Sequence, residues 1–130
     1  AWAAFCRDYK PVWKHIELPL YGSPDIGMPF AGTLDRIGEI DGRTRVVDIK
    51  TTASLDRPAK VALCEQITGY EWLADVNDID VSFGAGMGVQ LFADGNYRVH
   101  LTAEIARKYD FRSSSLFITL RKLYKITKGK

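Results

Sequence analysis

Apolar positions mark five extended segments along the chain. The first is an extended stretch over residues 12–20, and two further apolar runs occupy residues 30–40 and 44–51. An aspartate–glycine dipeptide separates these two runs, and because glycine tolerates the positive φ of a tight turn, the runs predict a β-hairpin. Residues 85–92 and 97–101 flank another aspartate–glycine pair and predict a second hairpin.

Helical periodicity marks three other segments. Residues 1–10 are expected to form a helix, since a proline follows at the point where the pattern ends. A long helix is expected over residues 58–76, with its proline in the first turn and Ser54 or Asp56 as the N-cap. A closing amphipathic helix is expected over residues 113–125.

The predicted order of elements defines the fold class. Helix, three strands, helix, two strands and helix together predict an α/β protein with a central mixed β-sheet of about five strands flanked by helices. The chain has 130 residues, of which 46% are hydrophobic, and this is enough for one compact core but too little for two. We therefore expect residues 1–130 to form a single domain.

Three further features bear on the setting of the protein. No segment approaches the roughly 18 to 20 apolar residues that span a bilayer, so we expect a soluble, cytoplasmic protein without a membrane partner. The chain begins at Ala1, inside an apolar helical pattern, which predicts a truncated N-terminus. Cys6 and Cys64 lack the spacing of a zinc or redox pair, so buried reduced thiols are expected.

The basic residues are unevenly distributed. The formal net charge is +2, but five of the 18 lysines and arginines lie beyond residue 120, where there is no acid. The rest of the chain is therefore mildly acidic, and its overall charge does not predict nucleic-acid binding. Attraction to a polyanion would have to come from the basic tail or from local cations such as Arg36, Arg57 and Lys60.

The second strand of the first hairpin carries an unusual pair of charges. The alternation of side chains along a strand places Asp48 and Lys50 on one face, and Val47 and Ile49 on the other. Because both faces carry apolar residues, this strand is expected to be central, where a buried charge costs roughly several kcal/mol unless it is compensated. The alternative is an exposed ion pair on an edge strand, which contributes about 0 to 1 kcal/mol.

A second carboxylate, that of Asp35, interrupts the apolar run of the preceding strand. The hairpin can bring it close to Asp48, and two such groups repel each other unless a cation lies between them. Mg²⁺ is a hard ion that suits this pair, and the Ile49 carbonyl could add a third oxygen. Lys50 would point into the same site, where it could orient or deprotonate water and offset the charge that grows on a phosphate.

Gln66 and Tyr70 stand four residues apart on the predicted long helix and so project from one side of it. An amide and a phenol in this position can hold phosphate oxygens or water. The alternative is a tyrosine packed at the edge of the core and a solvated glutamine. The position of the pair directly after the acidic hairpin favours the first interpretation.

Three motifs occur in order on strand, strand and helix. They are Gly32-Thr33-Leu34-Asp35, Val47-Asp48-Ile49-Lys50-Thr51 and Gln66-Ile67-Thr68-Gly69-Tyr70. Over residues 12–76 the combination resembles the PD-(D/E)XK nuclease superfamily, specifically its RecB-like branch with the Gln-x-x-x-Tyr motif, which includes phage exonucleases. Three motifs in the right order are considerably more specific than any one of them.

The resemblance implies a restriction-endonuclease-like core and Mg²⁺- or Mn²⁺-dependent hydrolysis of DNA, by an exonuclease or DNA-end-processing enzyme of a phage or recombination-repair type. It implies that Asp35 and Asp48 bind the metal, that Lys50 assists the attacking water, and that Gln66 and Tyr70 help to place the DNA backbone. DNA is the implied partner, together with a helicase, a recombinase or a single-strand-binding protein.

The sequence departs from the pattern of this superfamily at two points. The second acid is Asp48 where many members have glutamate, and the acidic or histidine motif expected on the first helix is not evident, since Asp8 is the only acid in residues 1–11. The alternative function is therefore a catalytically inactive module of the nuclease fold that binds DNA or a recombination or replication partner. A structural domain of a larger helicase–nuclease assembly is a third hypothesis.

Glu17 resembles a glutamate often seen on the first strand of relatives, and we take it as a further candidate site residue. Regular alternation would place His15 and Glu17 on the same strand face as Trp13. The alternative for His15 and Glu17 is a pair on the protein surface.

Overall fold

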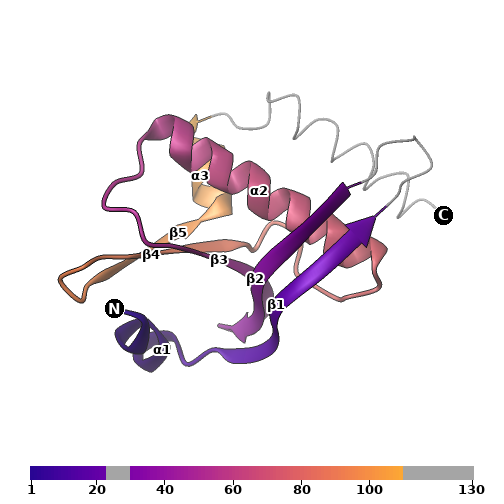
Figure 1. Ribbon diagram of the computed structural model, residues 1–130, viewed down its shortest axis with the longest axis horizontal. Coiled ribbons are helices and arrows are strands. Elements are labelled where there is room, and N and C mark those ends of the chain that lie inside the picture. The colour runs from indigo at the N-terminus through magenta and orange to yellow at the C-terminus, as the bar shows by residue number, and fades with distance from the viewer. Residues whose placement is uncertain (23–29, 110–130) are drawn as a thin grey trace.

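The computed structural model of the protein describes residues 1–22 and 30–109 (Figure 1). The elements in this part of the chain are α1 (Trp2–Tyr9), β1 (Val12–Gly22), β2 (Phe30–Ile40), β3 (Arg43–Lys50), α2 (Arg57–Val76), β4 (Met87–Leu91), β5 (Tyr97–Leu101) and α3 (Thr102–Tyr109). Their order up to β5 is the predicted one. The helix expected over residues 113–125 lies outside the described residues.

The strands form one mixed sheet in the order β1-β2-β3-β4-β5. β1, β2 and β3 are antiparallel neighbours, β3 and β4 pair in parallel, and β4 and β5 are antiparallel. The helix α2 connects the two parallel strands, as a parallel pair requires. The predicted α/β fold with a central mixed sheet flanked by helices is confirmed, and β3 occupies the middle of that sheet.

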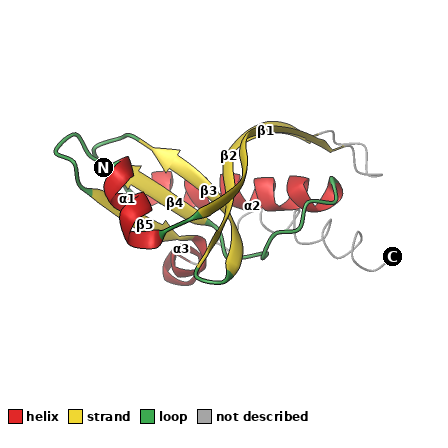
Figure 2. Cartoon of the chain, turned by 90° about the horizontal axis from the view of Figure 1, so that it is seen from below, coloured by secondary structure: helices red, strands yellow, loops and turns green. Residues whose placement is uncertain are grey.

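Helices cover both faces of the sheet, with α2 and α3 on one side and α1 on the other (Figures 1 and 2). Val46 is fully buried in the core beneath α2, where it joins Leu63 and Ile67. Val47 is also fully buried, but in the core that contains Phe5 of α1. Consecutive residues of β3 therefore point to opposite faces, and the alternation carries the side chain of Asp48 to the α2 face.

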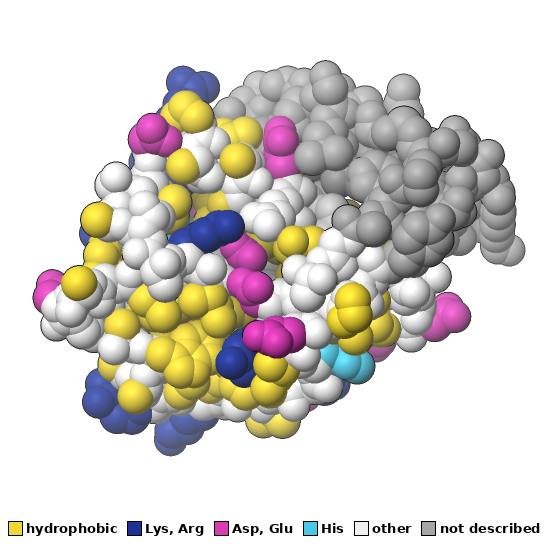
Figure 3. Space-filling model, in the orientation of Figure 1, with side chains coloured by type: hydrophobic (Ala, Val, Ile, Leu, Met, Phe, Trp, Pro, Cys, Tyr) yellow, Lys and Arg dark blue, Asp and Glu magenta, His cyan; other side chains and the backbone are white. Residues whose placement is uncertain are grey.

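Aromatic side chains join α1 to the sheet. The ring of Trp2 stacks on the rings of Phe5 and Trp13, with centroids 5.4 and 5.7 Å apart. The guanidinium of Arg36 lies over Trp2 and Trp13, 4.9 and 5.0 Å from their centroids, in two cation–π contacts. Hydrophobic side chains gather in Figure 3 between α1 and the strands. Arg36, expected as a local cation for a polyanion, is engaged on this face instead.

The start of α2 follows its sequence signals. The carboxylate of Asp56 accepts a hydrogen bond of 3.0 Å from the backbone N–H of Ala59, and Pro58 occupies the first turn. Asp56 is therefore the N-cap, and of the two predicted candidates Ser54 is not. A side-chain cap contributes about 1 kcal/mol and determines where the helix begins.

Glycine at position 88 lets α2 pack closely against β4. A Cβ atom built at Gly88 would lie 2.6 Å from Cδ2 of Leu63, closer than side-chain carbons approach one another. We expect Gly88→Val to lower the free energy of unfolding by about 1 to 3 kcal/mol, because the buried side chain of Leu63, or the helix that carries it, must move away from the sheet. Gly69→Ala is the control, since nothing lies within 4 Å of that position.

Urea denaturation of both variants measures this effect. Gly69→Ala should raise the free energy of unfolding by about 0.5 to 1 kcal/mol, because glycine is a poor residue inside a helix. A Gly88→Val variant as stable as the unsubstituted chain would show that α2 does not depend on this close approach.

The last described helix, α3, was not predicted. It begins at Thr102, directly after the last residue of β5, so no loop residue marks its start in the sequence. Contacts far along the chain hold it: the N–H of Thr102 donates to the carbonyl of Gly86 at 3.1 Å, and Ile105 packs against Cys64 of α2. Tertiary contacts, rather than local signals, determine where α3 forms.

The two cysteines are free thiols, as expected. Cys64 is buried, and burial raises the pKa of its thiol to about 12, so the reactive thiolate does not form near neutral pH. Cys6 is only half-buried, which corrects the expectation that both would be buried.

In residues 1–22 and 30–109, no helix has both the length and the apolar character needed to cross a bilayer.

Candidate active site

The end of the first hairpin brings the two predicted carboxylates together. The ladder between β2 and β3 extends only as far as the pair Arg36 and Val47. Beyond that point the carboxylate of Asp35 accepts a hydrogen bond of 2.9 Å from the backbone N–H of Ile49. This bond takes the place of the next backbone bond in the ladder, and it holds the Asp35 carboxylate beside Asp48.

Asp48 is almost completely buried, with 3% of its surface exposed. Burial, and then contact with the Asp35 carboxyl, raise the pKa of its carboxyl from an ordinary 3.8 to about 6, although Lys50 acts to lower it. This influence of Asp35 on Asp48 is the mark of two carboxylates that share one site. The register partner of Asp48 in β4 is Gly88, against which Leu63 of α2 packs.

Lys50 links the carboxylates to the long helix. Its Nζ lies 3.1 Å from Oδ2 of Asp48 and donates a hydrogen bond of 3.2 Å to Oε1 of Gln66. The amide Nε2 of Gln66 in turn donates to the hydroxyl of Tyr70 at 3.1 Å. The predicted residues Asp48, Lys50, Gln66 and Tyr70 therefore form one continuous chain of polar contacts from β3 to α2.

The ring of Tyr70 lies directly over Gly32 of β2. A Cβ atom built at Gly32 would lie 2.9 Å from Cε1 of Tyr70. Any other residue at this position would push the ring aside. Gly32 therefore allows the tyrosine to approach the sheet next to the carboxylates, a role that its place in the first motif did not reveal.

Glu17 and Asp8 stand apart from this arrangement. Glu17 is exposed, has a positive φ of 50°, and makes no hydrogen bond or ion pair to Asp35 or Asp48 in the described part of the chain. Asp8 accepts a hydrogen bond of 2.6 Å from the hydroxyl of Tyr97, which ties α1 to β5. The acid of the first helix is thus engaged on the α1 face, opposite the carboxylate pair.

An irregularity in β1 explains why the side chains at its start do not alternate regularly between the two faces of the sheet. The register shifts between Trp13, which pairs with Gly38, and His15, which pairs with Ile37. Paired residues lie on the same face and successive residues on opposite faces, so Trp13 and His15 face opposite ways. The expectation that Trp13, His15 and Glu17 share one face is wrong.

The donor atoms of the site suit a hard divalent cation. Asp48 Oδ2 is buried and makes no hydrogen bond among the described residues beyond its ion pair with Lys50. In an extended strand the N–H and C=O of one residue point to the same side, so the Ile49 carbonyl is directed toward Asp35. Two carboxylates and a carbonyl are the ligands that Mg²⁺ and Mn²⁺ take, so the residues fit such an ion. No cluster of three His, Cys, Asp or Glu side chains arranged for a metal occurs in residues 1–22 and 30–109.

Two buried polar residues beside the site were not anticipated. Gln90 of β4 is the register partner of Lys50, and its amide donates to the carbonyl of Thr52 at 3.0 Å. Nε2 of His100 lies 2.9 Å from Oε1 of Gln90. The signal available in the sequence was a glutamine in an otherwise apolar strand, which folding alone does not favour.

The fold and this arrangement define the protein as an α/β protein with a carboxylate pair and a lysine on the helix-covered face of a mixed sheet. No family model and no curated protein matches the chain. Twelve chains of solved structures match, among them the crystal structure of SSO0001, which is 16% identical with a TM-score of 0.49. That match covers 87% of this chain and 56% of SSO0001, so this chain spans little more than half the length of that protein.

Proposed function

We propose that the protein is a Mg²⁺-dependent DNA nuclease that hydrolyses phosphodiester bonds, as an exonuclease or a DNA-end-processing enzyme. The observation that carries the proposal is the convergence of Asp35 and Asp48 on one site, with the Lys50 ammonium 3.1 Å from Asp48. A buried charged group on a central strand costs stability, and catalysis is a reason to retain it.

Asp35, Asp48 and the Ile49 carbonyl would hold the metal ion. Bound there, Mg²⁺ or Mn²⁺ would supply positive charge against the phosphate oxygens and favour ionisation of water. The raised pKa of Asp48, about 6, leaves its carboxyl mostly ionised at neutral pH and therefore ready to bind a cation.

Lys50 supplies the second positive charge. Hydrolysis adds water to phosphorus and breaks one ester P–O bond, and negative charge grows on the phosphoryl oxygens as it proceeds. With 35% of its side chain exposed, Lys50 can reach a bound phosphate while Asp48 and Gln66 hold its Nζ in position. It orients the attacking water and offsets the growing charge.

Gln66 and Tyr70 contribute at the side of the helix. Their contact at 3.1 Å uses one amide proton of Gln66 and leaves the hydroxyl proton of Tyr70 available to a phosphate oxygen. Such contacts orient the DNA backbone relative to the carboxylates, without reading its sequence.

A second function, a non-catalytic module that binds DNA or a recombination or replication partner, is favoured by one observation. Only two carboxylates meet in the described site, and Asp8 of the first helix is bonded to Tyr97 on the other face. A site with fewer charged ligands binds a divalent ion more weakly, and weak binding would leave the fold without its activity.

Calorimetric titration with Mg²⁺ and Mn²⁺, followed by a cleavage assay on DNA, tests the proposal. We expect metal binding that Asp35→Asn abolishes and Asp41→Asn leaves unchanged. The two substitutions are identical and lie in one hairpin, but Asp41 is exposed in its turn. Cleavage together with binding supports the nuclease, and binding without cleavage supports the non-catalytic module. Absence of binding would exclude the metal site itself.

A further inference from the structure

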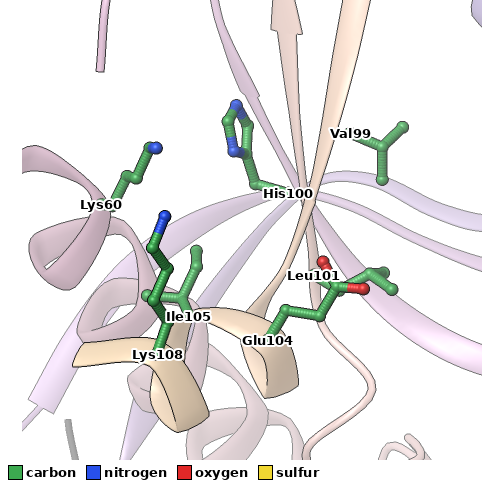
Figure 4. Close-up of a pocket in the computed structure, with 7 residues that line it drawn as sticks. All are labelled: Lys60, Val99, His100, Leu101, Glu104, Ile105 and Lys108. Carbon is green, nitrogen blue, oxygen red and sulfur yellow. The ribbon is translucent and has the colours of Figure 1, made fainter. Parts of the chain in front are cut away.

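A hollow of about 150 Å³ lies between the start of α2, β5 and α3, outside the carboxylate site. It is lined by Lys60, Val99, His100, Leu101, Glu104, Ile105 and Lys108. Figure 4 shows the amino groups of Lys60 and Lys108 and one ring nitrogen of His100 turned toward the same space. The Glu104 carboxylate is directed away from these nitrogen atoms (Figure 4).

The size and charge of the hollow indicate which class of ligand it can bind. Sites for drug-sized molecules enclose about 300 to 1,000 Å³, so this one is too small for a nucleoside. It has room for about five water molecules, and therefore for one tetrahedral anion. Its lining has two lysines against one acid, so it attracts a negative charge.

The hydrogen bonds of Gln90 determine which ring nitrogen of His100 carries the proton. The amide nitrogen of Gln90 donates to the Thr52 carbonyl, so its oxygen is the atom that faces His100 and can only accept. His100 Nε2 therefore carries the proton, and Nδ1 gains one only when the ring becomes charged. Burial, and then Lys60 and Arg98, lower the pKa of the ring, which is neutral at pH 7 when no anion is bound.

The sheet aligns this hollow with the carboxylate site. Asp48 pairs with Gly88, and Gly88 pairs with His100, so the three residues form one row across β3, β4 and β5. They lie on the same face, separated by two strand spacings, or roughly 10 Å. Leu63 of α2 packs on Gly88 between them, so a DNA strand would have to pass around the helix. One strand carries a phosphate about every 3.4 Å along the axis, so the two sites are at least about three phosphates apart along it.

We propose that the hollow binds a non-scissile phosphate of the DNA strand, held by Lys60, Lys108 and His100. That the hollow binds a phosphate group is independent of the proposed nuclease function. That this phosphate belongs to DNA rests on the proposed nuclease function. A second phosphate bound at a fixed distance from Asp48 would determine which phosphodiester of the DNA strand lies at the carboxylate site.

Inorganic phosphate is the first probe, and NMR titration of the histidine rings is the readout. The chain has two histidines, so His15 on β1 serves as an internal control. At constant ionic strength, replacing chloride with phosphate should raise the pKa of His100 by about one unit, because an adjacent anion favours the charged ring. The NMR signals of the His15 ring should be the same in chloride and in phosphate.

Lys60→Gln should reduce this shift to less than half, whereas Lys14→Gln, an equal charge change on the exposed part of β1, should not. No shift at His100, or an undiminished shift in Lys60→Gln, would overturn the phosphate site. This part of the test needs no catalytic activity, so it stands even if the chain cleaves no DNA.

Steady-state cleavage tests the link to DNA. Lys60→Gln should raise KM severalfold with kcat unchanged. Replacing single phosphates by neutral methylphosphonates should reproduce the effect at one internal position, three or more linkages from the cleaved bond. An effect confined to a terminal phosphate would assign the hollow to a strand end, and this would overturn the internal position. Cleavage unaffected by either change would exclude a role for the hollow in DNA binding.

Discussion

Replacement of Asp48 by asparagine should reduce metal-dependent DNA cleavage by about 10³-fold or more, while the chain keeps its fold. The amide has the same shape as the carboxylate but lacks the charge that would hold the cation and fix Lys50 at 3.1 Å. Loss of one preorganised electrostatic partner alone costs an active site about 10²- to 10³-fold, and loss of a metal ligand adds to this.

The same substitution should leave the free energy of unfolding unchanged, or raise it by on the order of 1 kcal/mol. Burial raises the pKa of Asp48 above its unfolded value, so at pH 7 the ionised carboxylate opposes folding, and the neutral amide removes this cost. Lys50, left without its partner, is exposed enough to be hydrated. Replacing a residue that serves catalysis but destabilises the fold therefore makes a protein more stable while it removes the activity.

Lys50→Ala should also abolish cleavage, since no other described cation contacts Asp48. Asp41→Asn and Lys14→Ala are the matched controls, because each makes a comparable change at an exposed position outside the site. Initial rates on radiolabelled DNA and urea denaturation curves provide the two measurements. Retention of cleavage in both Asp48→Asn and Lys50→Ala would refute the assignment of this site to nuclease chemistry.

The second large effect concerns Glu71, a carboxyl buried in α2 with 1% of its surface exposed. Burial raises its pKa from 4.5 to about 8, and the hydrogen bond of 3.0 Å from the backbone N–H of Gly84 only partly offsets this. Glu71 is therefore protonated in the folded protein at neutral pH, although it is ionised in the unfolded chain.

The direction of the pH effect follows from these two values. Because the folded pKa is raised, the stabilising contribution of protonated Glu71 is fully present below pH 4.5 and is lost as the pH rises through 8. Each pKa unit corresponds to about 1.4 kcal/mol, so the loss is on the order of several kcal/mol between pH 5 and pH 9. The protein should unfold in less urea as the pH is raised.

Glu71→Gln isolates this contribution. Glutamine keeps an oxygen that can accept the Gly84 N–H but does not titrate, so the variant should lose much less stability between pH 5 and pH 9 than the unsubstituted chain. Glu65→Gln, a substitution at a half-buried position on the same helix, should not change the pH dependence. Parallel pH curves for Glu71→Gln and the unsubstituted chain would contradict a protonated, buried Glu71.

Local sequence signals determined much of the architecture. The aspartate–glycine turn and the two apolar runs sufficed for the β2–β3 hairpin, and Asp56 with Pro58 marked the start of α2. These features depend on backbone preferences and side-chain periodicity within a few residues, which the sequence expresses directly. The same periodicity assigned Asp48 and Lys50 to one face of a central strand.

Other features were decided only by contacts between distant parts of the chain. The bulge after Trp13 turned His15 to the other face, and α3 began without a local stop or start signal. The partner of Asp8 is a tyrosine 89 positions away. No window of the sequence contains both members of such a pair, so the pairing follows from how the sheet and helices pack.

Some features of the candidate site were likewise evident from the sequence, and others depended on the tertiary structure. The sequence by itself singled out the residues that meet in the site, because Asp35, Asp48, Lys50, Gln66 and Tyr70 stand out from the apolar pattern around them. Only the tertiary structure decided that the Asp35 carboxylate bonds the Ile49 N–H where the ladder ends, and that β5 sets His100 in line with Asp48. The physical reason is that strand register and helix packing are properties of the whole sheet, whereas side-chain alternation belongs to each strand alone.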